Sequence, residues 1–254
     1  MSRWRAWVDR ALASLFEPPC VSCGHTVPRP LQGAVCDLCW ARLARFTPPW
    51  CASCGMPLPS WRVASVETGR CARCRRRPAV LARQAAVGPH DGVLREVVHA
   101  LKYDARHSTA APLAALMRES GAGVLDGAHL LVPVPLHARR AWTRGFNQAE
   151  RLARHLGPPV YPLLARTRAT PPQVSLPAAL RHRNVRDAFR WRPRVGARAV
   201  GDTAVPVGRL IVVLVDDVCT TGATLDACAR ELAAAGVGEI RALTASRVVT
   251  GPPA

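Results

Sequence analysis

Two adjacent carboxylates, Asp216 and Asp217, stand between an apolar run and a turn rich in threonine. Carboxylate oxygens accept hydrogen bonds from sugar hydroxyls, so two neighbouring acids can serve two neighbouring hydroxyls. The turn that follows offers three hydroxyls and several backbone N–H groups, from Thr220, Thr221, Gly222, Ala223 and Thr224. N–H groups at the start of a helix form an anion site that suits a phosphate. Together, these groups predict a site for a ribose 5-phosphate.

The segments around this site predict part of an α/β sheet. Residues 210–215 are a continuous run of β-branched and aliphatic residues, which is typical of a strand buried on both faces of a parallel sheet. We expect a helix over residues 221–235, with Gly236 at its C-cap, and a strand over residues 240–246. An ordinary strand–turn–helix unit without a ligand is the alternative. It is disfavoured because two adjacent acids followed at this fixed distance by Thr-Thr-Gly-Ala-Thr are an uncommon combination.

Eight of the ten cysteines form four C-x-x-C pairs before residue 75. Twelve residues separate the first two pairs, and 16 residues separate the last two. Pairs of thiolates with such a spacer are typical of zinc ribbons, in which four cysteines hold one structural zinc ion. We expect two zinc sites, with the pairs used either in sequence or in a cross-braced order. The predicted ligands are Cys20, Cys23, Cys36, Cys39, Cys51, Cys54, Cys71 and Cys74.

Two other kinds of cysteine chemistry are disfavoured. Disulfides would suit an exported chain, but Asp9 and Arg10 interrupt the apolar stretch that a secretion signal would need. A catalytic zinc of the deaminase type requires a His-x-Glu sequence, and the chain contains none. We therefore predict that both zinc ions are structural.

Lys102 is the only lysine among 35 lysine and arginine residues. It ends an apolar pattern of helical spacing at residues 91–102. Because arginine serves elsewhere in the chain, a retained lysine indicates that a compact ammonium group is needed, as at a phosphate or diphosphate.

A predicted strand at residues 129–135 ends in Pro133, Val134 and Pro135. Proline fixes the backbone, so these residues predict a rigid loop at the carboxyl end of a strand, where α/β sheets bind ligands. Basic residues that could neutralise an anion there follow closely, at Arg139, Arg140 and Arg144. Shorter patterns predict helices at residues 108–118 and 147–155, a strand at 160–163 and a loop at 121–127.

These motifs together resemble those of the type I phosphoribosyltransferases and, more closely, of the ComF family associated with bacterial competence. The acidic and Thr-rich motif at residues 210–225 carries the broader resemblance. The closer one adds LKY at 101–103, VPVPL at 132–136, RGFNQA at 144–149, RHRN at 181–184 and the upstream cysteine pairs.

The resemblance implies binding of 5-phosphoribosyl-1-diphosphate (PRPP) with Mg²⁺ and displacement of diphosphate through an oxocarbenium-like state. By this analogy Asp216 and Asp217 hold the ribose hydroxyls and residues 220–224 hold the 5-phosphate. The loop at 133–135 holds the diphosphate, and Arg144 and Lys102 stabilise the departing charge. Four further residues match the family within a lid: Gln173, Arg181, Asn184 and Phe189.

The implied fold class is α/β: a type I phosphoribosyltransferase-like parallel sheet flanked by helices, with a small N-terminal double zinc ribbon. We expect an amphipathic helix at residues 1–17, the double zinc ribbon at 18–78 and the α/β domain at 79–254. The segment 164–208 is too long for a simple loop in a compact domain, so we predict a lid or an inserted substructure. The first helix either docks on its own protein, which we favour, or lies on a membrane surface.

The formal net charge is +18, or about +14 once two zinc sites with four thiolates each are counted. Such a charge favours polyanionic partners, which include PRPP or another ribose 5-phosphate and single-stranded DNA. A cluster of arginines around the last cysteine pair is a candidate DNA patch: Arg70, Arg73, Arg75, Arg76 and Arg77. A biased nucleotide composition explains the arginine excess equally well. No apolar stretch is long enough to span a membrane, so we expect a cytoplasmic protein.

Three functions agree with these observations. The first is an active phosphoribosyltransferase with an unknown nitrogen acceptor. The second is a sensor that binds PRPP or a nucleotide without turnover. The third is a DNA-handling competence factor that uses the zinc ribbon and basic surface, alone or with other competence proteins.

Overall fold

The computed structural model describes residues 4, 8, 18–30, 33–58, 69–76, 80–103, 107–137, 142, 145–168 and 187–249. The helix predicted at residues 1–17 therefore lies outside the described residues, apart from Trp4 and Val8.

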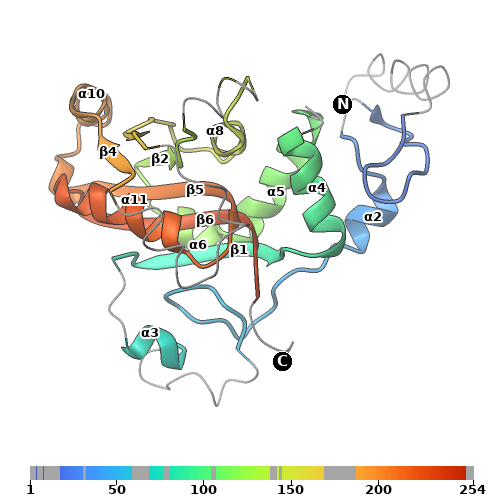
Figure 1. Ribbon diagram of the computed structural model, residues 1–254, viewed down its shortest axis with the longest axis horizontal. Coiled ribbons are helices and arrows are strands. Elements are labelled where there is room, and N and C mark those ends of the chain that lie inside the picture. The colour runs from blue at the N-terminus through green and yellow to red at the C-terminus, as the bar shows by residue number, and fades with distance from the viewer. Residues whose placement is uncertain are drawn as a thin grey trace.

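The centre of the molecule is a parallel sheet of four strands in the order β1-β6-β5-β2 (Figure 1). Its strands are β1 (Arg83–Pro89), β2 (Leu130–Pro133), β5 (Ile211–Cys219) and β6 (Glu239–Arg247). Val215 of β5 pairs with Leu243 of β6 on one side and with Pro133 of β2 on the other. This sheet, with the helices around it and the two cysteine groups before it, confirms the predicted α/β fold class.

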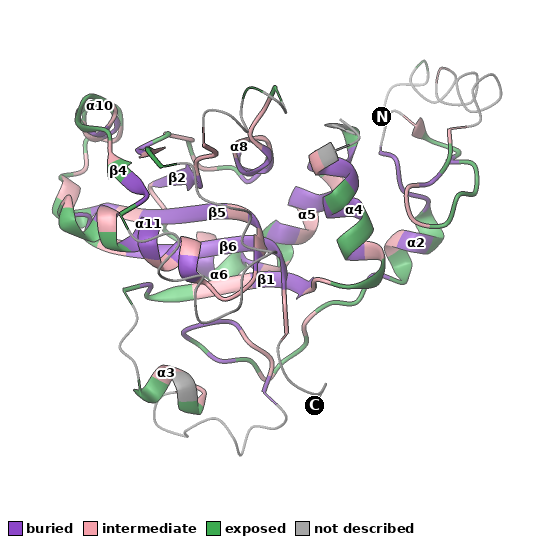
Figure 2. Cartoon of the chain, viewed as in Figure 1, coloured by how far each residue is buried: buried purple, intermediate pink, exposed green. Residues whose placement is uncertain are grey.

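Both faces of the sheet are covered, and alternate side chains of β5 enter two different cores. Val213 and Val215 pack in a core with α4 (Gly92–Tyr103), α5 (Ala110–Ser120) and α8 (Gln148–Ala153). Val212 and Leu214 pack on the opposite face, in a core with α11 (Ala223–Ala234). Since successive side chains of a strand point to opposite faces, this alternation places the next two residues, Asp216 and Asp217, on opposite faces. Figure 2 shows β5 buried along most of its length.

The predicted element boundaries hold with three differences. β5 runs to Cys219, so that it includes both acids, because β6 continues to pair with it up to the register Cys219–Arg247. The predicted strand at residues 160–163 is reduced to an isolated bridge between Val160 and Leu131. The predicted loop at residues 121–127 contains a short helix, α6 (Ala122–Leu125), which begins directly after α5.

Residues 164–208 form a small substructure against α11 where they are described. It consists of the antiparallel strands β3 (Leu164–Arg166) and β4 (Phe189–Trp191), the helix α10 (Pro193–Thr203) and the 3-10 turn η4 (Val207–Arg209). The backbone N–H of Thr167 donates to the carbonyl of Ala188 at 2.9 Å, so these two described residues lie side by side. The lid residues Gln173, Arg181 and Asn184 lie outside the described residues.

The N-terminal part contains two tight turns with the same hydrogen bonds. In the first, the Cys20 N–H donates to His25 O at 2.8 Å and the Gly24 N–H donates to Cys20 O at 2.9 Å. In the second, the Cys51 N–H donates to Met56 O at 2.9 Å and the Gly55 N–H donates to Cys51 O at 2.8 Å. Gly24 and Gly55 both have positive φ, at 76° and 67°, which glycine adopts without strain. The third and fourth cysteines of each group lie at or beside a short helix, α2 (Asp37–Ala41) or α3 (Ala72–Arg76).

The segment between the two turns runs along β1, which is an edge strand. The Phe46 N–H donates to Val87 O at 2.9 Å, and a Cβ on Gly88 would stand 2.0 Å from Ala44 O. Gly55 of the second turn also lies close to β1, because its Cβ would stand 2.5 Å from Gln84 O. The backbone of this segment therefore covers an edge that would otherwise expose unpaired groups.

Candidate functional site

The Asp217 carboxylate lies at the centre of a polar cluster at the carboxyl end of β5. Asp217 is 6% exposed, and its side chain continues the α4 and α8 side of the strand. Lys102 Nζ, from the last turn of α4, lies 3.2 Å from Asp217 Oδ2. Gln148 Nε2, from the first residue of α8, donates to the same oxygen at 3.1 Å. The structure thus brings together two predicted site residues, Lys102 and Asp217, that are distant in the sequence.

The predicted loop at Pro133, Val134 and Pro135 is held against this cluster. The Val134 N–H donates to Val215 O at 2.9 Å, and Asn147 Nδ2 donates to Val134 O at 3.0 Å. Asn147 is also the N-cap of α8, because its Oδ1 accepts from the Ala149 N–H at 3.0 Å. One asparagine therefore fixes both the loop and the helix that carries Gln148.

His90 and Ser246 are connected to the cluster by hydrogen bonds that lead to the Asp217 backbone. His90 Nδ1 and Ser246 Oγ are 2.8 Å apart, and Ser246 Oγ donates to Asp217 O at 3.4 Å. With its own proton given to Asp217 O, Ser246 accepts from His90, so Nδ1 carries the imidazole proton. Burial, reinforced by the positive charge of Lys102, lowers the pKa of His90 and keeps the ring neutral near pH 7.

Asp216 points away from this cluster, because it continues the Val212 and Leu214 side of β5. Burial raises the pKa of Asp216 to about 8, and the charge of Asp217 adds to the increase. A hydrogen bond from the Asp217 N–H to Asp216 Oδ1, at 2.9 Å, acts in the opposite direction, and so does the charge of Arg166. The two adjacent acids therefore differ: Asp217 is paired with a cation, whereas Asp216 is held toward its protonated form.

The Thr-rich turn directly follows β5 and leads into α11. Gly222, the N-cap of α11, has a φ of 84°, a left-handed conformation that the turn needs and that glycine favours. Thr221 Oγ1 accepts from the Ala223 N–H at 3.4 Å. Thr220, Thr221, Gly222 and Thr224 are all partly exposed, so groups of the predicted phosphate site are accessible at the start of a helix of 12 residues.

The eight predicted zinc ligands form two groups of four. One group contains Cys20, Cys23, Cys36 and Cys39, and the other contains Cys51, Cys54, Cys71 and Cys74. The sulfurs of each group lie within 4.8 Å of one another, as four tetrahedral ligands of one ion require. The pairs are thus used in sequence, and the cross-braced order is wrong.

Hydrogen bonds to sulfur show that both groups are suited to thiolates. The Cys36 N–H donates to Cys20 Sγ at 3.4 Å, and the Cys71 N–H donates to Cys51 Sγ at 3.3 Å. A hydrogen bond from the Cys54 thiol lowers the pKa of Cys51 to about 4, while the same contact and burial raise the pKa of Cys54. Crowded thiols share protons in this way, and a dication would replace those protons. The residues therefore fit two structural zinc ions.

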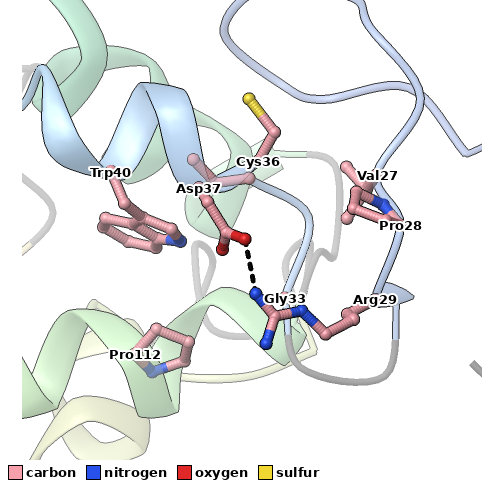
Figure 3. Close-up of a pocket in the computed structure, with 9 residues that line it drawn as sticks. Val27, Pro28, Arg29, Gly33, Cys36, Asp37, Trp40 and Pro112 are labelled. Atoms are coloured by element: carbon pink, nitrogen blue, oxygen red, sulfur yellow. Dashed lines mark hydrogen bonds and ion pairs between the residues drawn. The ribbon is translucent and has the colours of Figure 1, made fainter. Parts of the chain in front are cut away.

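A separate pocket of about 240 Å³ lies between the first cysteine group and α5 (Figure 3). Trp40 and Pro112 line it, and Arg29 forms an ion pair with Asp37 across it. None of the residues that line this pocket belongs to the Asp217 cluster.

The remaining predicted residues are placed as follows. Arg139, Arg140 and Arg144 lie outside the described residues. Gln148 was not predicted as a site residue, although its neighbour Asn147 marks the start of a helix. Among the described helices, none is both long and apolar enough to cross a membrane.

Bacterial relatives match the chain over most of its length. DNA utilization protein YhgH of Salmonella typhimurium is 33% identical over 220 residues, which cover 82% of this chain and 87% of that protein. DNA utilization protein YhgH of Escherichia coli K12 is 31% identical with the same coverage. Competence protein F of Haemophilus influenzae is 27% identical over 240 residues, or 91% of this chain and 97% of that protein. In addition, residues 11–75 match the double zinc ribbon domain family.

Proposed function

The chain belongs to the ComF family, and on that premise we propose that it binds PRPP, or a related ribose 5-phosphate, at the carboxyl ends of β2 and β5. The observation that supports this most is the ion pair between partly buried Lys102 and buried Asp217, three residues before the partly exposed Thr-rich turn. A carboxylate, an ammonium group and the hydroxyl and N–H groups at the start of a helix match a hydroxyl, a diphosphate and a monophosphate in charge and hydrogen bonding.

Each part of the ligand has a proposed partner. Asp217 accepts from the ribose, and residues 220–224 donate to the 5-phosphate. The diphosphate lies against Pro133, Val134 and Pro135, where Lys102, together with Arg144, neutralises its charge. Mg²⁺, when bound together with PRPP, would supply positive charge that offsets the charge of the diphosphate. Hydrogen bonds and charge interactions are stronger in a buried environment, so the buried Asp217 is better suited to bind a ribose hydroxyl than an exposed acid would be.

Calorimetry with Mg-PRPP tests the proposal. Asp217→Asn keeps the shape but loses charge-assisted hydrogen bonds of about 1.5–3 kcal/mol each, so affinity should fall at least tenfold. Asp202→Asn is the matched control, because Asp202 is an exposed residue of α10 whose hydrogen bonds, among the described residues, are with Tyr161 and Arg198. Equal affinities of wild type and Asp217→Asn would refute the site. Consumption of PRPP with a panel of nitrogen acceptors then separates a transferase from a sensor.

A second proposed function is binding of single-stranded DNA next to the second zinc site. The matched relatives are named for DNA utilization and competence, and the chain carries a net charge of +18. Arg70, Arg75 and Arg76 are exposed beside Cys71 and Cys74, and Arg75 Nη1 donates to Arg70 O at 2.9 Å. Exposed guanidinium groups on a metal-bound turn are suited to phosphate contacts without sequence preference.

The salt dependence of DNA binding tests this second function. Changing Arg70, Arg75 and Arg76 to serine removes three cations and should reduce the slope of log affinity against log salt by about 2. A variant with the same loss of charge elsewhere on the surface, Arg194, Arg209 and Arg230 to serine, should keep the slope. If both triple variants bind alike, the arginines next to Cys71 do not contact DNA.

A further inference from the structure

His90 stands directly after β1, with one ring nitrogen fixed and the other unused. Its Nδ1 donates to Ser246 Oγ at 2.8 Å, and Ser246 Oγ donates in turn to Asp217 O at 3.4 Å. The backbone is held as well, because the His90 N–H donates to Arg247 O at 2.7 Å. Among the described residues Nε2 makes no hydrogen bond, and His90 is partly exposed. In the neutral ring, Nε2 therefore carries a lone pair that can accept a proton from a ligand.

The charged groups around His90 keep the ring neutral near pH 7. Burial lowers the pKa of His90, and the charges of Lys102 and Arg95, both on α4, act in the same direction. The charges of Asp217 and Asp91 oppose this shift, but the pKa remains below the ordinary value of 6.5. A neutral imidazole whose tautomer is fixed by a hydrogen bond is suited to general base catalysis.

The other acids at this end of the sheet are not available as bases at pH 7. Asp217 is paired with Lys102 and accepts a hydrogen bond from Gln148. Asp216 faces the opposite core and is held toward its protonated form. Residues 218–225, which form the end of β5, the Thr-rich turn and the start of α11, include no carboxylate and no imidazole. Among the described groups of the site, His90 is therefore the one placed to take a proton.

The order of the strands puts His90 on the side from which an acceptor would enter. In the order β1-β6-β5-β2, the proposed diphosphate loop follows β2 at one edge and the proposed ribose position is at β5 (Figure 1). β1 is the opposite edge strand, and His90 is the residue that follows it. A nucleophile that displaces a leaving group must be aligned with it on the opposite side of the reacting carbon. The acceptor should therefore lie toward the ends of β6 and β1.

We propose that His90 is the general base of a phosphoribosyl transfer, in which its Nε2 takes a proton from a nitrogen acceptor. The lone pair of the acceptor nitrogen forms the new bond to the anomeric carbon of PRPP. The bond between that carbon and the diphosphate oxygen breaks, and its electron pair leaves with the diphosphate. The N–H proton of the acceptor moves to Nε2, and the resulting imidazolium returns it to water. The proposal rests on the proposed function and selects its enzymatic form, with an acceptor that carries an N–H group, over a sensor.

His90→Asn tests the proposal, because the amide of asparagine can still donate to Ser246 Oγ while the base is removed. The release of diphosphate from Mg-PRPP is measured with ammonia, primary amines, and purine and pyrimidine bases as acceptors. With an acceptor that the wild type uses, kcat should fall at least about hundredfold, whereas the calorimetric affinity for Mg-PRPP should stay unchanged. Imidazole added to the buffer should restore part of the rate. His155→Asn is the matched control and should behave as the wild type, because His155 is exposed beyond the end of α8.

The pH profile is a readout that a merely structural role would not move. The wild-type kcat should fall as the pH drops below the ordinary histidine pKa of 6.5, because a protonated ring accepts no proton, and His90→Asn should lack this fall. His90→Gln gives the same comparison if the asparagine variant does not fold. A variant that keeps the wild-type kcat or the same fall at low pH would overturn the proposal.

Two outcomes for the wild type separate this proposal from the proposed function. A wild type that binds Mg-PRPP but releases no diphosphate with any of the acceptors would overturn the role of His90, while the ligand site stands. A wild type that does not bind Mg-PRPP would overturn the proposed function, and the role of His90 with it.

Discussion

Replacing Gly88 by alanine should loosen the segment between the two cysteine groups from the edge of the sheet. A Cβ on Gly88 would stand 2.0 Å from Ala44 O and 3.0 Å from Ala44 C. Both atoms belong to the backbone, so no flexible side chain can move aside. Gly88 has no positive φ, and the cost of the substitution is therefore steric rather than conformational.

The size of the effect follows from the contacts that must change. Overpacking of this kind costs about 1–3 kcal/mol. Separation of the two backbones also breaks the hydrogen bond from the Phe46 N–H to Val87 O, which contributes about 0.5–1.5 kcal/mol. The sum is about 3 kcal/mol, and at about 3 °C per kcal/mol for a chain of this size Tm should fall by about 9 °C.

Thermal unfolding followed by circular dichroism measures this change. Gly201→Ala is the matched control, because Gly201 is exposed within α10 and its Cβ would meet no atom within 4 Å. In a helix this substitution should stabilise the protein by up to about 1 kcal/mol. A Gly88→Ala protein that unfolds at or above the wild-type Tm would refute the close approach of Ala44 to β1.

Three further predictions concern the zinc sites and Asp216. Elemental analysis should find about two zinc ions per chain, and fewer than one would contradict the two four-cysteine groups. Arg247→Met removes the hydrogen-bond donor to Cys54 O, so the zinc ion of the second cysteine group should be released about tenfold faster. A chelating dye measures this rate, and release of both ions at the same rate would contradict the prediction. For Asp216, the folded state keeps its proton up to about pH 8, whereas the unfolded chain loses it near 3.8, so folding stability falls as pH rises between these values. Asp216→Asn lacks this loss, and its Tm advantage over wild type should therefore grow from pH 5 to pH 8; a constant difference would contradict the raised pKa.

The fold could be predicted because its signals are local. The apolar run at residues 210–215 required a strand buried on both faces, and the C-x-x-C spacing required two metal groups. The direction of each acid could not be predicted, because it depends on where β5 ends. Asp216 pairs in register with Thr244, and pairing continues to Cys219 and Arg247, so β6 extends the strand beyond both acids. Pairing with β6, which is distant in the sequence, thus determines that Asp216 and Asp217 point to opposite faces of the sheet.

Gln148 shows a second limit of reading the chain alone. It lies 69 residues from Asp217, and its place in the site follows from the packing of α8 against β5. Two signals in the sequence point to this position: the RGFNQA motif at 144–149, and the pair Asn147–Gln148 at the start of a predicted helix. Asparagine is a favoured N-cap, and the following residue is then free to turn inward. Only the contact with Asp217 shows that this side chain meets a carboxylate.

Arg247 connects the second zinc site to the proposed ligand site. Its Nη1 donates to Cys54 O at 2.7 Å, and the side chain is buried at the end of β6. Its backbone carbonyl accepts from the His90 N–H at 2.7 Å, and its register partner is Cys219, the residue before the Thr-rich turn. A displacement of the turn at Cys54 would therefore reach His90 and Cys219 through Arg247. Gly55 also leaves no space between this turn and β1, so the ribbon and the sheet are packed together here as one unit. Loss of zinc should therefore change the geometry of the proposed ligand site.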